Sequence, residues 1–267
     1  MSASAKLYQL EGIVLGRRDY GEADRIVICL TPQGRIDFLA KGTRKTRSRK
    51  AGHLELFART QLLISRVEGS WDIISQAEAL ALRPSLQDDY ARGTYARYVA
   101  ELVMRFFERE ADAELYGLLD GTLSKLEEDD NPELLVRWYE QRLLTIAGFR
   151  PEWHTCVGER AGSLCGLKLS PRPADRRSYG VDPERGGALC TECFGTLRSE
   201  PGVRALSPSA LSWFQALQQR EYADLKDFPL PDSTAAELAA VMQLYIAHHL
   251  EYSPTTLRMM SKGRPHP

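Results

Sequence analysis

The sequence predicts an α+β protein with an N-terminal β-barrel and an all-α C-terminal domain that carries an inserted cysteine-rich segment. Three observations support this fold class. The first eighty residues contain short apolar runs separated by turn signals. Later segments carry apolar residues at helical spacing, and four of the five cysteines lie within 38 residues that lack periodicity. The expected domains are residues 1–80, 84–150, 151–202 and 203–267, the second and the last being two parts of the helical domain.

Length and composition are those of an ordinary globular protein. The 267 residues are 43% apolar and 27% charged, enough for a substantial core and for about two domains. No apolar run reaches the roughly 18 residues of a membrane helix, and the N-terminus has no apolar secretion signal. An odd number of cysteines without an export signal argues against disulfides. We therefore expect a cytoplasmic protein without a membrane partner.

Five short strands are expected in the first domain. Pro32-Gln33-Gly34 is a turn signal between two of them, and Glu68-Gly69 marks a hairpin between the last two. Five strands in this length fit a small closed barrel, because closure leaves no exposed sheet edge. Both an OB-type and an SH3-like barrel satisfy the pattern. The expected strands cover residues 11–15, 25–31, 35–40, 60–65 and 70–75.

Positive charge is concentrated in the N-terminal part of the chain. Residues 1–80 hold 13 Lys/Arg against 9 Asp/Glu, whereas residues 81–150 hold 9 against 14. The run from Lys41 to Lys50 contains six cations and no acid, and it lacks apolar periodicity, which indicates a loop. Like charges at this density repel one another, and a phosphate backbone would remove that repulsion. A solvated loop without a partner is the alternative interpretation.

Helical periodicity begins near residue 84. Residues 115–126 and 134–146 predict a second and a third helix. Ser207-Pro208 has the pattern of an N-cap followed by proline at the first helical position. Thr234 and Glu237 have capping-box spacing at the start of the last helix. We interpret the apolar stripes of these helices as core. In the first helix the residues that share one face are Tyr95, Tyr98, Val99, Leu102 and Phe106.

The aperiodic segment from residue 150 to residue 202 requires something to hold it together, because long structureless stretches are uncommon in compact domains. Cys190 and Cys193 form a Cys-x-x-Cys pair, the spacing that directs two thiolates at one tetrahedral zinc ion. Cys156 and Cys165 are the other pair, but eight residues separate them. We predict a zinc-finger-like Cys₄ site with four protein ligands, in which zinc is structural. Unligated thiols are the alternative.

The first cysteine pair sets a geometric condition. Glu159 occupies the position where a Cys-x-x-Cys would have its second thiol. The segment from Gly158 to Ser163 must therefore loop out if Cys165 is to reach the ion. His154 is a candidate substitute ligand. The fifth cysteine, Cys29, lies in a predicted strand and is expected to be a buried core thiol.

The sequence contains no familiar catalytic motif. It has no P-loop, no Gly-x-Gly-x-x-Gly, no His-Glu-x-x-His and no Gly-x-Ser-x-Gly. His248 and His249 are adjacent, so on a helix they point in different directions. Without a nucleophile and base in a recognisable pattern, we predict that the protein is not an enzyme.

Several segments, taken in order, resemble the RecO family of bacterial DNA-repair proteins. Tyr20-Gly-Glu-Ala-Asp-Arg25 leads into Leu30-Thr-Pro-Gln-Gly34, and Ala40-Lys-Gly42 precedes the basic run. A helical region follows, then Gly186-Gly-Ala-Leu-Cys-Thr-Glu-Cys193, then a final helix running into Tyr252-Ser-Pro-Thr-Thr-Leu257. The resemblance covers nearly the whole chain. One departure concerns the metal, since zinc-bearing members usually have Cys-x-x-Cys in the first half as well.

The resemblance implies an N-terminal OB fold, a helical domain and a zinc-finger insert. It implies a recombination mediator that binds single- and double-stranded DNA, anneals complementary strands and works with RecR. Together these proteins help to load RecA onto strands coated by single-stranded DNA-binding protein, whose acidic, apolar C-terminal tail is a frequent partner. The place of action would be the cytoplasm, in association with the nucleoid.

A cationic barrel agrees with this implication, because such a groove can follow a nucleic-acid backbone. Phe38, Phe57 and Trp71 could stack on bases, but each is expected to belong to the barrel core. Arg17, Arg18 and Arg25 are weaker candidates for phosphate contacts. The predicted DNA-binding residues are Arg35, Lys41, Arg44, Lys45, Arg47, Arg49 and Lys50.

Two other functions fit the same residues. One is an RNA-binding or ribosome-associated protein with an OB barrel and a zinc site. The other is an adaptor whose helices bind protein and whose basic loop is idle. Binding competition between DNA and RNA of one sequence distinguishes the RNA-binding protein from a DNA-repair protein. Charge reversal in the loop identifies the adaptor, because the affinity for oligonucleotides would then be unchanged.

Overall fold

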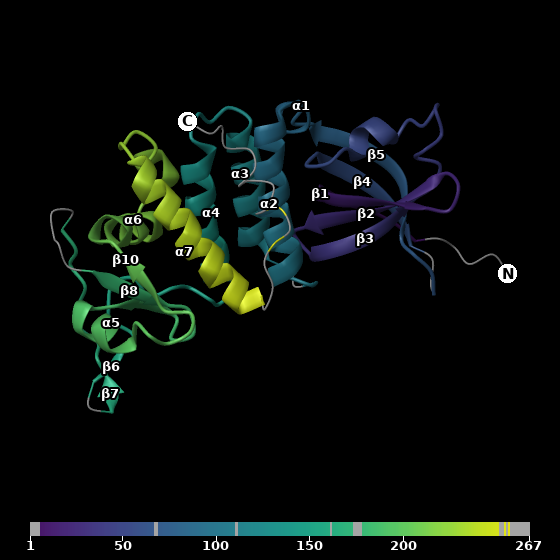
Figure 1. Ribbon diagram of the computed structural model, residues 1–267. Coiled ribbons are helices and arrows are strands. Elements are labelled where there is room, and N and C mark those ends of the chain that lie inside the picture. The colour runs from purple at the N-terminus through teal and green to yellow at the C-terminus, as the bar shows by residue number, and fades with distance from the viewer. Residues whose placement is uncertain are drawn as a thin grey trace. The chain divides into compact units, whose positions relative to one another are not determined.

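The computed structural model describes residues 6–66, 69–109, 112–160, 162–172, 178–250, 254 and 256. The chain forms two compact units, the first ending at Asp129 and the second beginning at Asp130 (Figure 1). The first unit contains a sheet and three α-helices, and the second contains the cysteine-rich segment among helices. Within the described residues, no helix is both long and apolar enough to cross a membrane.

The sheet of the first unit closes into a five-stranded barrel with the order β1-β2-β3-β5-β4. Closure depends on the long first strand, which pairs antiparallel with β4 through its first half and with β2 through its second half. Leu39 and Ile73 join β3 to β5 in parallel. The five predicted strands are present as β1 (Lys6–Tyr20), β2 (Asp24–Thr31), β3 (Gly34–Ala40), β4 (Arg59–Arg66) and β5 (Ile73–Ala81).

The last strand differs from its prediction. It begins at Ile73 and continues to Ala81, so that Trp71 precedes it instead of lying within it. The pairing of β4 with β5 is antiparallel, as expected for a hairpin. Glu68, one of the two residues that we assigned to the hairpin turn, lies outside the described residues.

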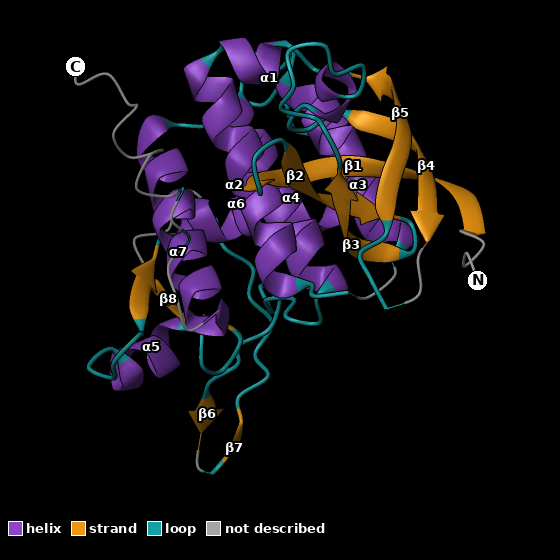
Figure 2. Ribbon diagram, turned by 90° about the vertical axis from the view of Figure 1, so that its right-hand side faces the viewer, coloured by secondary structure: helices purple, strands orange, loops and turns teal. Residues whose placement is uncertain are grey.

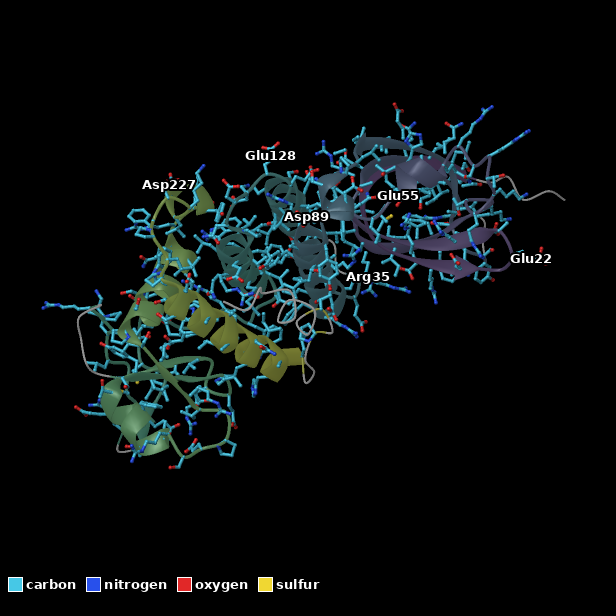
Figure 3. All side chains as sticks on the ribbon, turned by 45° about the horizontal axis from the view of Figure 1, so that its top comes forward. Glu22, Arg35, Glu55, Asp89, Glu128 and Asp227 are labelled. Atoms are coloured by element: carbon cyan, nitrogen blue, oxygen red, sulfur yellow. The ribbon has the colours of Figure 1, made fainter. Side chains whose placement is uncertain are left out.

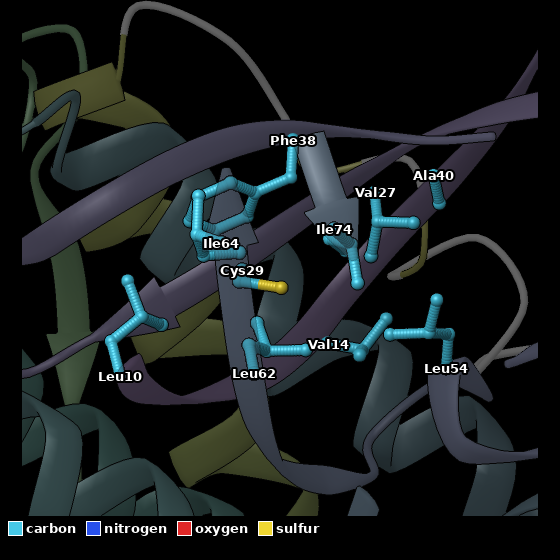
Figure 4. Close-up of a cluster of buried hydrophobic side chains, with 10 residues drawn as sticks. All are labelled: Leu10, Val14, Val27, Cys29, Phe38, Ala40, Leu54, Leu62, Ile64 and Ile74. Carbon is cyan, nitrogen blue, oxygen red and sulfur yellow. The ribbon is translucent and has the colours of Figure 1, made fainter. Parts of the chain in front are cut away.

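The barrel interior is filled by a continuous apolar cluster (Figure 4). Phe38 and Cys29 are fully buried in it, and burial raises the pKa of the Cys29 thiol to about 12. The prediction of a buried core thiol at Cys29 is therefore confirmed. The cluster consists of Leu10, Val14, Val27, Cys29, Phe38, Ala40, Leu54, Leu62, Ile64 and Ile74.

Helices follow the barrel in the first unit: η1 (Ala51–Leu54) within the β3–β4 connection, then α1 (Ser85–Asp88), α2 (Tyr90–Phe106) and α3 (Ala113–Leu126). A buried arginine ties α3 to the barrel. Arg83 donates to the Phe57 carbonyl at 2.6 Å, to the Asp120 carboxylate, and to the Ser124 hydroxyl at 3.0 Å. Arg83 itself adopts a left-handed conformation, with φ of 55°.

Three helices of the second unit pack against one another: α4 (Pro132–Ile146), α6 (Pro208–Gln219) and α7 (Asp232–Leu250). The predicted start of α6 is confirmed, since Ser207 accepts a hydrogen bond from the Ala210 amide and Pro208 follows it. The predicted capping box of α7 is wrong. The helix begins at Asp232, and the Glu237 carboxylate instead accepts from the backbone and hydroxyl of Ser207, at 2.7 and 2.6 Å.

The cysteine-rich segment folds into a small module. Its sheet has the order β10-β8-β9, and a separate two-stranded hairpin, β6–β7, extends away from the sheet (Figure 2). The short helix α5 lies beside β8. These elements are β6 (Glu159–Arg160), β7 (Ser163–Leu164), β8 (Tyr179–Asp182), β9 (Gly187–Leu189), α5 (Thr191–Leu197) and β10 (Arg204–Leu206); the short η2 (Tyr222–Asp224) follows α6.

Trp153 joins this module to the helices of its unit. The indole is fully buried and stacks on Phe214, with ring centroids 4.4 Å apart. Its Nε1 donates to the side-chain oxygen of Gln141 at 2.9 Å. Gln218 donates to that same oxygen and to the Pro151 carbonyl. Because hydrogen bonds link Trp153, Gln141 and Gln218 in the interior, the attachment is specific as well as apolar.

The Arg83 contacts generate a stability prediction. We expect Arg83→Met to lower the free energy of unfolding by about 3 kcal/mol, because the change removes one partner of a buried ion pair and leaves the Phe57 carbonyl without its donor. Arg25→Met removes an exposed pair with Asp19 and should lower it by less than about 1 kcal/mol. Urea unfolding of both variants measures the difference. Equal losses would show that Arg83 does not join the barrel to the helix.

Candidate metal centre and nucleic-acid interface

Four cysteines of the second unit meet at one point. Cys156, Cys165, Cys190 and Cys193 place their sulfur atoms within 4.8 Å of one another. Zinc–thiolate bonds of about 2.3 Å in a tetrahedron put neighbouring sulfurs about 3.8 Å apart, so the cluster has nearly the dimensions of a filled site. Cys165 is partly exposed and the other three are buried. The set fits a thiophilic ion with four protein ligands and no open position.

The excursion that the sequence required between the first two cysteines is present. β6 (Glu159–Arg160) and β7 (Ser163–Leu164) pair as a hairpin, in which Arg160 lies opposite Ser163. At its base the Cys165 amide donates to the Gly158 carbonyl at 2.7 Å. The hairpin thus accommodates the additional residues between Cys156 and Cys165 and brings Cys165 back to the cluster. His154, the candidate substitute, is not among the grouped ligands, and its Nε2 lies 3.3 Å from Gln219.

Hydrogen-bond donors converge on the sulfur atoms. The Cys190 amide donates to the Cys156 sulfur at 3.1 Å, and Arg160 donates to the Cys190 sulfur at 3.0 Å. Burial alone would raise the pKa of Cys190, but donors from the Cys193 backbone and Arg160 lower it to about 7. Burial raises the pKa of Cys156 to about 12. Metal binding at this cluster therefore displaces protons from thiols, as it does wherever thiolates are ligands.

The basic run forms a loop whose backbone is held by the barrel. The Gly42 amide donates to the Asp24 carboxylate at 2.7 Å, and the Arg44 amide donates to the Ala23 carbonyl at 2.9 Å. Gly42 has a φ of 69°, which favours glycine. The loop is therefore ordered by contacts of its backbone, while most of its charged side chains extend outward. An acid that is distant in sequence, Asp24, supplies the anchor.

The structure separates the predicted DNA contacts into two groups. Lys41, Lys45, Arg47 and Arg49 are exposed, and none of them pairs with an acid in the described part of the chain. Arg44 is exposed as well, but its guanidinium lies 3.3 Å from the Asp19 carboxylate and 3.2 Å from the Gly21 carbonyl. Four cations of the loop thus remain available for a partner.

The other two predicted contacts are bonded to backbone. Lys50 donates to the Ile74 carbonyl at 2.8 Å, and burial lowers the pKa of its ammonium. Arg35 donates to the carbonyls of Met104 and Phe107, at 2.8 and 3.2 Å, where the barrel meets α2 (Figure 3). Both side chains therefore have a structural role that a charge count along the chain cannot detect.

A groove of about 650 Å³ lies on the barrel beside the β4–β5 connection. Trp71 is 38% exposed at its edge, so the expectation that it belongs to the core is wrong. The reason is its place before β5, where no sheet face covers the ring. Phe38 and Phe57 are buried, as expected. The groove is lined by Arg35, Ile36, Asp37, Arg66, Gly69, Ser70, Trp71, Asp72 and Arg109.

The groove has a mixed charge with an excess of cations. Arg66 lies 3.1 Å from Asp72, which also accepts a hydrogen bond from Tyr8 at 2.7 Å. The side chain of Arg66 remains 58% exposed, so its outer donors face solvent. Three arginines, two aspartates and one exposed indole combine charge with an aromatic face. The sequence indicated this surface only in part, through Arg35 as a predicted phosphate contact and Trp71 as a candidate stacking residue.

A closed barrel with an exposed cationic loop, helices after it and a cluster of four thiols define a protein with a candidate nucleic-acid interface and a candidate metal site. Comparison with known families identifies the family to which it belongs. Residues 1–83 match the family described as Recombination protein O N terminal, and residues 87–258 match Recombination protein O C terminal. The chain belongs to the RecO family of DNA-repair proteins.

Curated relatives agree over nearly the full length. The chain is 34% identical to the DNA repair protein RecO of Roseiflexus sp. (strain RS-1), over 97% of this chain and 87% of the relative. It is 33% identical to that of Desulforudis audaxviator, over 96% and 97% of the two chains. For Symbiobacterium thermophilum the identity is 34%, over 92% and 93%. The predicted resemblance is confirmed, and it favours DNA repair over the ribosome-associated alternative.

Close packing at the cysteine cluster yields a prediction about metal affinity. A Cβ at Gly158 would lie 2.7 Å from the Cys193 Cβ and 2.9 Å from its sulfur. Gly158→Ala should therefore displace Cys193 and weaken Co²⁺ binding by about tenfold or more. Gly195→Ala, in α5 of the same module, meets open space and should bind as the unmodified chain does. Titration followed by cobalt–thiolate absorbance measures both. Equal affinities would contradict a metal site built on these four sulfurs.

Proposed function

We propose that this protein binds single- and double-stranded DNA through its barrel and anneals complementary strands without catalysing a covalent reaction. The observation that carries the proposal is the set of four exposed cations on a loop with an anchored backbone: Lys41, Lys45, Arg47 and Arg49. Such a loop contacts phosphates, which gives affinity with little sequence preference.

We propose an OB-type barrel, and the strand order supports this over an SH3-like one. OB barrels are five-stranded, and they bind oligonucleotides on the face of strands 2 and 3 and on the loops joining strands 1–2 and 4–5. In this chain Arg35 lies on β3, and Trp71 lies in the β4–β5 connection. The groove between them would accept unpaired bases, with Trp71 as the stacking surface. The loop would hold the adjoining phosphates.

Annealing follows from charge neutralisation. Two strands approach one another against phosphate repulsion, and a cationic surface that holds both reduces that barrier. No nucleophile, base or metal-bound water is needed for base pairing. The seven predicted contacts keep different roles in this proposal: the four exposed cations bind directly, Arg44 contributes from beside Asp19, and Arg35 and Lys50 keep the groove and loop in place.

Family membership supports the proposed partners. We propose that the protein acts with RecR in loading RecA onto strands coated by single-stranded DNA-binding protein. A groove of about 590 Å³ between β10 and α7 suits the acidic, apolar tail of that coat protein. Its floor is apolar, at Ala240, Leu244 and Ala247, and Arg204 supplies a cation at the edge. The acid in the lining, Glu237, accepts hydrogen bonds from Ser207. An apolar peptide with acidic groups matches the apolar floor and the cation.

We propose zinc as the ion of the cysteine cluster, with Cys156, Cys165, Cys190 and Cys193 as ligands. Four thiolates in a reducing compartment favour zinc over harder ions. Zinc would hold the short strands of the module together, because they enclose a limited apolar core of their own. The role is structural, since four protein ligands leave no position for substrate.

Neutralising the loop tests the DNA interface. Lys45→Gln/Arg47→Gln should weaken oligonucleotide binding and slow annealing. It should also reduce the slope of log affinity against log salt by about 1.4 for single strands, since each lost phosphate contact removes about 0.7. Fluorescence anisotropy at several salt concentrations measures the slope.

The control has the same change of net charge elsewhere. Lys125→Gln/Lys226→Gln removes two exposed cations, one from α3 and one after η2, and should leave the slope unchanged. If both double variants behave alike, only net charge matters and the loop is idle, as in the adaptor hypothesis.

Trp71 gives a separate prediction about unpaired bases. Trp71→Ala should weaken single-strand binding by about 1–3 kcal/mol, the usual value of one aromatic stacking contact, and affect duplex binding less because paired bases are not free to stack. Leu82→Ala shortens another side chain of this unit that is 46% exposed, and it should have no effect. Anisotropy with both substrates provides the comparison. Equal losses for the two substrates would rule out stacking.

A further inference from the structure

The long first cysteine spacing delivers an arginine to the thiol cluster. Arg160 lies on β6 of the hairpin that the additional residues form. Its Nη2 is 3.0 Å from the Cys190 sulfur, and its Nη1 is 2.8 Å from the Glu192 carboxylate. A guanidinium that bonds a ligand atom on one side and a carboxylate on the other has its orientation fixed.

We propose that Arg160 is a positioning residue for the metal centre, which holds the Cys190 thiolate in place and offsets the negative charge of a four-thiolate site. The proposal rests on the proposed metal at this cluster. It goes beyond the ligand set because it assigns a function to the hairpin that separates Cys156 from Cys165.

Charge explains why the site needs such a residue. Four thiolates and one divalent ion carry a net charge of −2, and burial makes that charge unfavourable. Backbone amides of Cys190 and Cys193 donate to sulfur, at 3.1 and 3.5 Å, but they bring no formal charge. Arg160 brings a full positive charge into direct contact with a ligand atom. Outer contacts of this kind strengthen metal binding substantially.

Solvent access gives a second reason. A cavity of about 390 Å³ reaches the cluster at Cys190, and Arg160, Thr191 and Glu192 are among the residues that line it. The bridge from Arg160 to Glu192 therefore stands where a competing ligand would approach the Cys190 sulfur. With a spacing of two residues between the first cysteines, no hairpin would exist to carry Arg160 to this position.

The test uses the full chain and measures metal directly. Zinc in the purified protein is quantified first, and its affinity and release rate are then obtained by competition with the chelator 4-(2-pyridylazo)resorcinol. We expect Arg160→Gln to lower zinc affinity about tenfold, which is the lower end of the losses seen when a hydrogen-bond partner of a metal ligand is removed. Zinc release should be faster in the same variant. Glu192→Gln should have a smaller effect in the same direction, since Arg160 keeps its charge but loses its orienting partner.

Two controls separate positioning from a general effect of charge. Arg198→Gln removes an exposed cation from the end of α5 in the same module and should leave zinc affinity unchanged. Arg160→Lys keeps a cation near Cys190 and should recover part of the affinity. The cobalt–thiolate absorption band should shift in Arg160→Gln and not in Arg198→Gln, because only the former alters a donor to sulfur.

The outcomes distinguish this inference from the proposal on which it rests. Zinc present in the unmodified chain, with equal affinity and an unshifted cobalt band in Arg160→Gln, would overturn the role of Arg160 alone. A chain that neither contains zinc nor takes up cobalt would overturn the metal assignment, and the role of Arg160 with it. Since Arg160 is exposed on a surface hairpin, circular dichroism should show the variant folded.

Discussion

Strand β1 provides the backbone hydrogen bonds on which the first unit depends. It pairs with β4 and with β2 along successive halves, so one strand closes the sheet on both sides. The partner changes at Ile13, and a bulge between Val14 and Gly16 follows within the pairing with β2, where it bends the strand. Closure removes exposed edges and gives the barrel one interior, and it fixes the ends of the strands from which the basic loop and the groove arise.

The basic loop illustrates how this constraint produces a binding surface. Six cations close together repel one another, and a loop held by its side chains would have to neutralise them. Here the backbone is held instead, by Asp24 at the start of β2 and by turn bonds within the loop. Cations that face the barrel, such as Lys50, hydrogen-bond to carbonyls, and those that face solvent stay available. A lysine or arginine of the loop thus stabilises the structure or is available for binding according to whether its side chain faces the barrel or the solvent.

The second unit solves a different problem, that of holding short strands without a large core. Trp153 anchors the cysteine module to the helices through stacking and through the Gln141 and Gln218 amides. The four thiols meet at one point within the module. The buried hydrogen bonds around Trp153 favour one arrangement of the module over others. Preorganisation of this kind lowers the entropy lost on metal binding.

Local sequence determined much of this protein, because turn residues, alternation, helical spacing and caps act over a few positions. The five strands, the helix after Ser207, the buried Cys29 and the excursion between Cys156 and Cys165 were all predictable. Tertiary structure decided the strand order, the exposure of Trp71, the partners of Arg35 and the use of Glu237 by Ser207. Each of these depends on a group far away in the sequence, and no pattern along the chain records which distant group will be near.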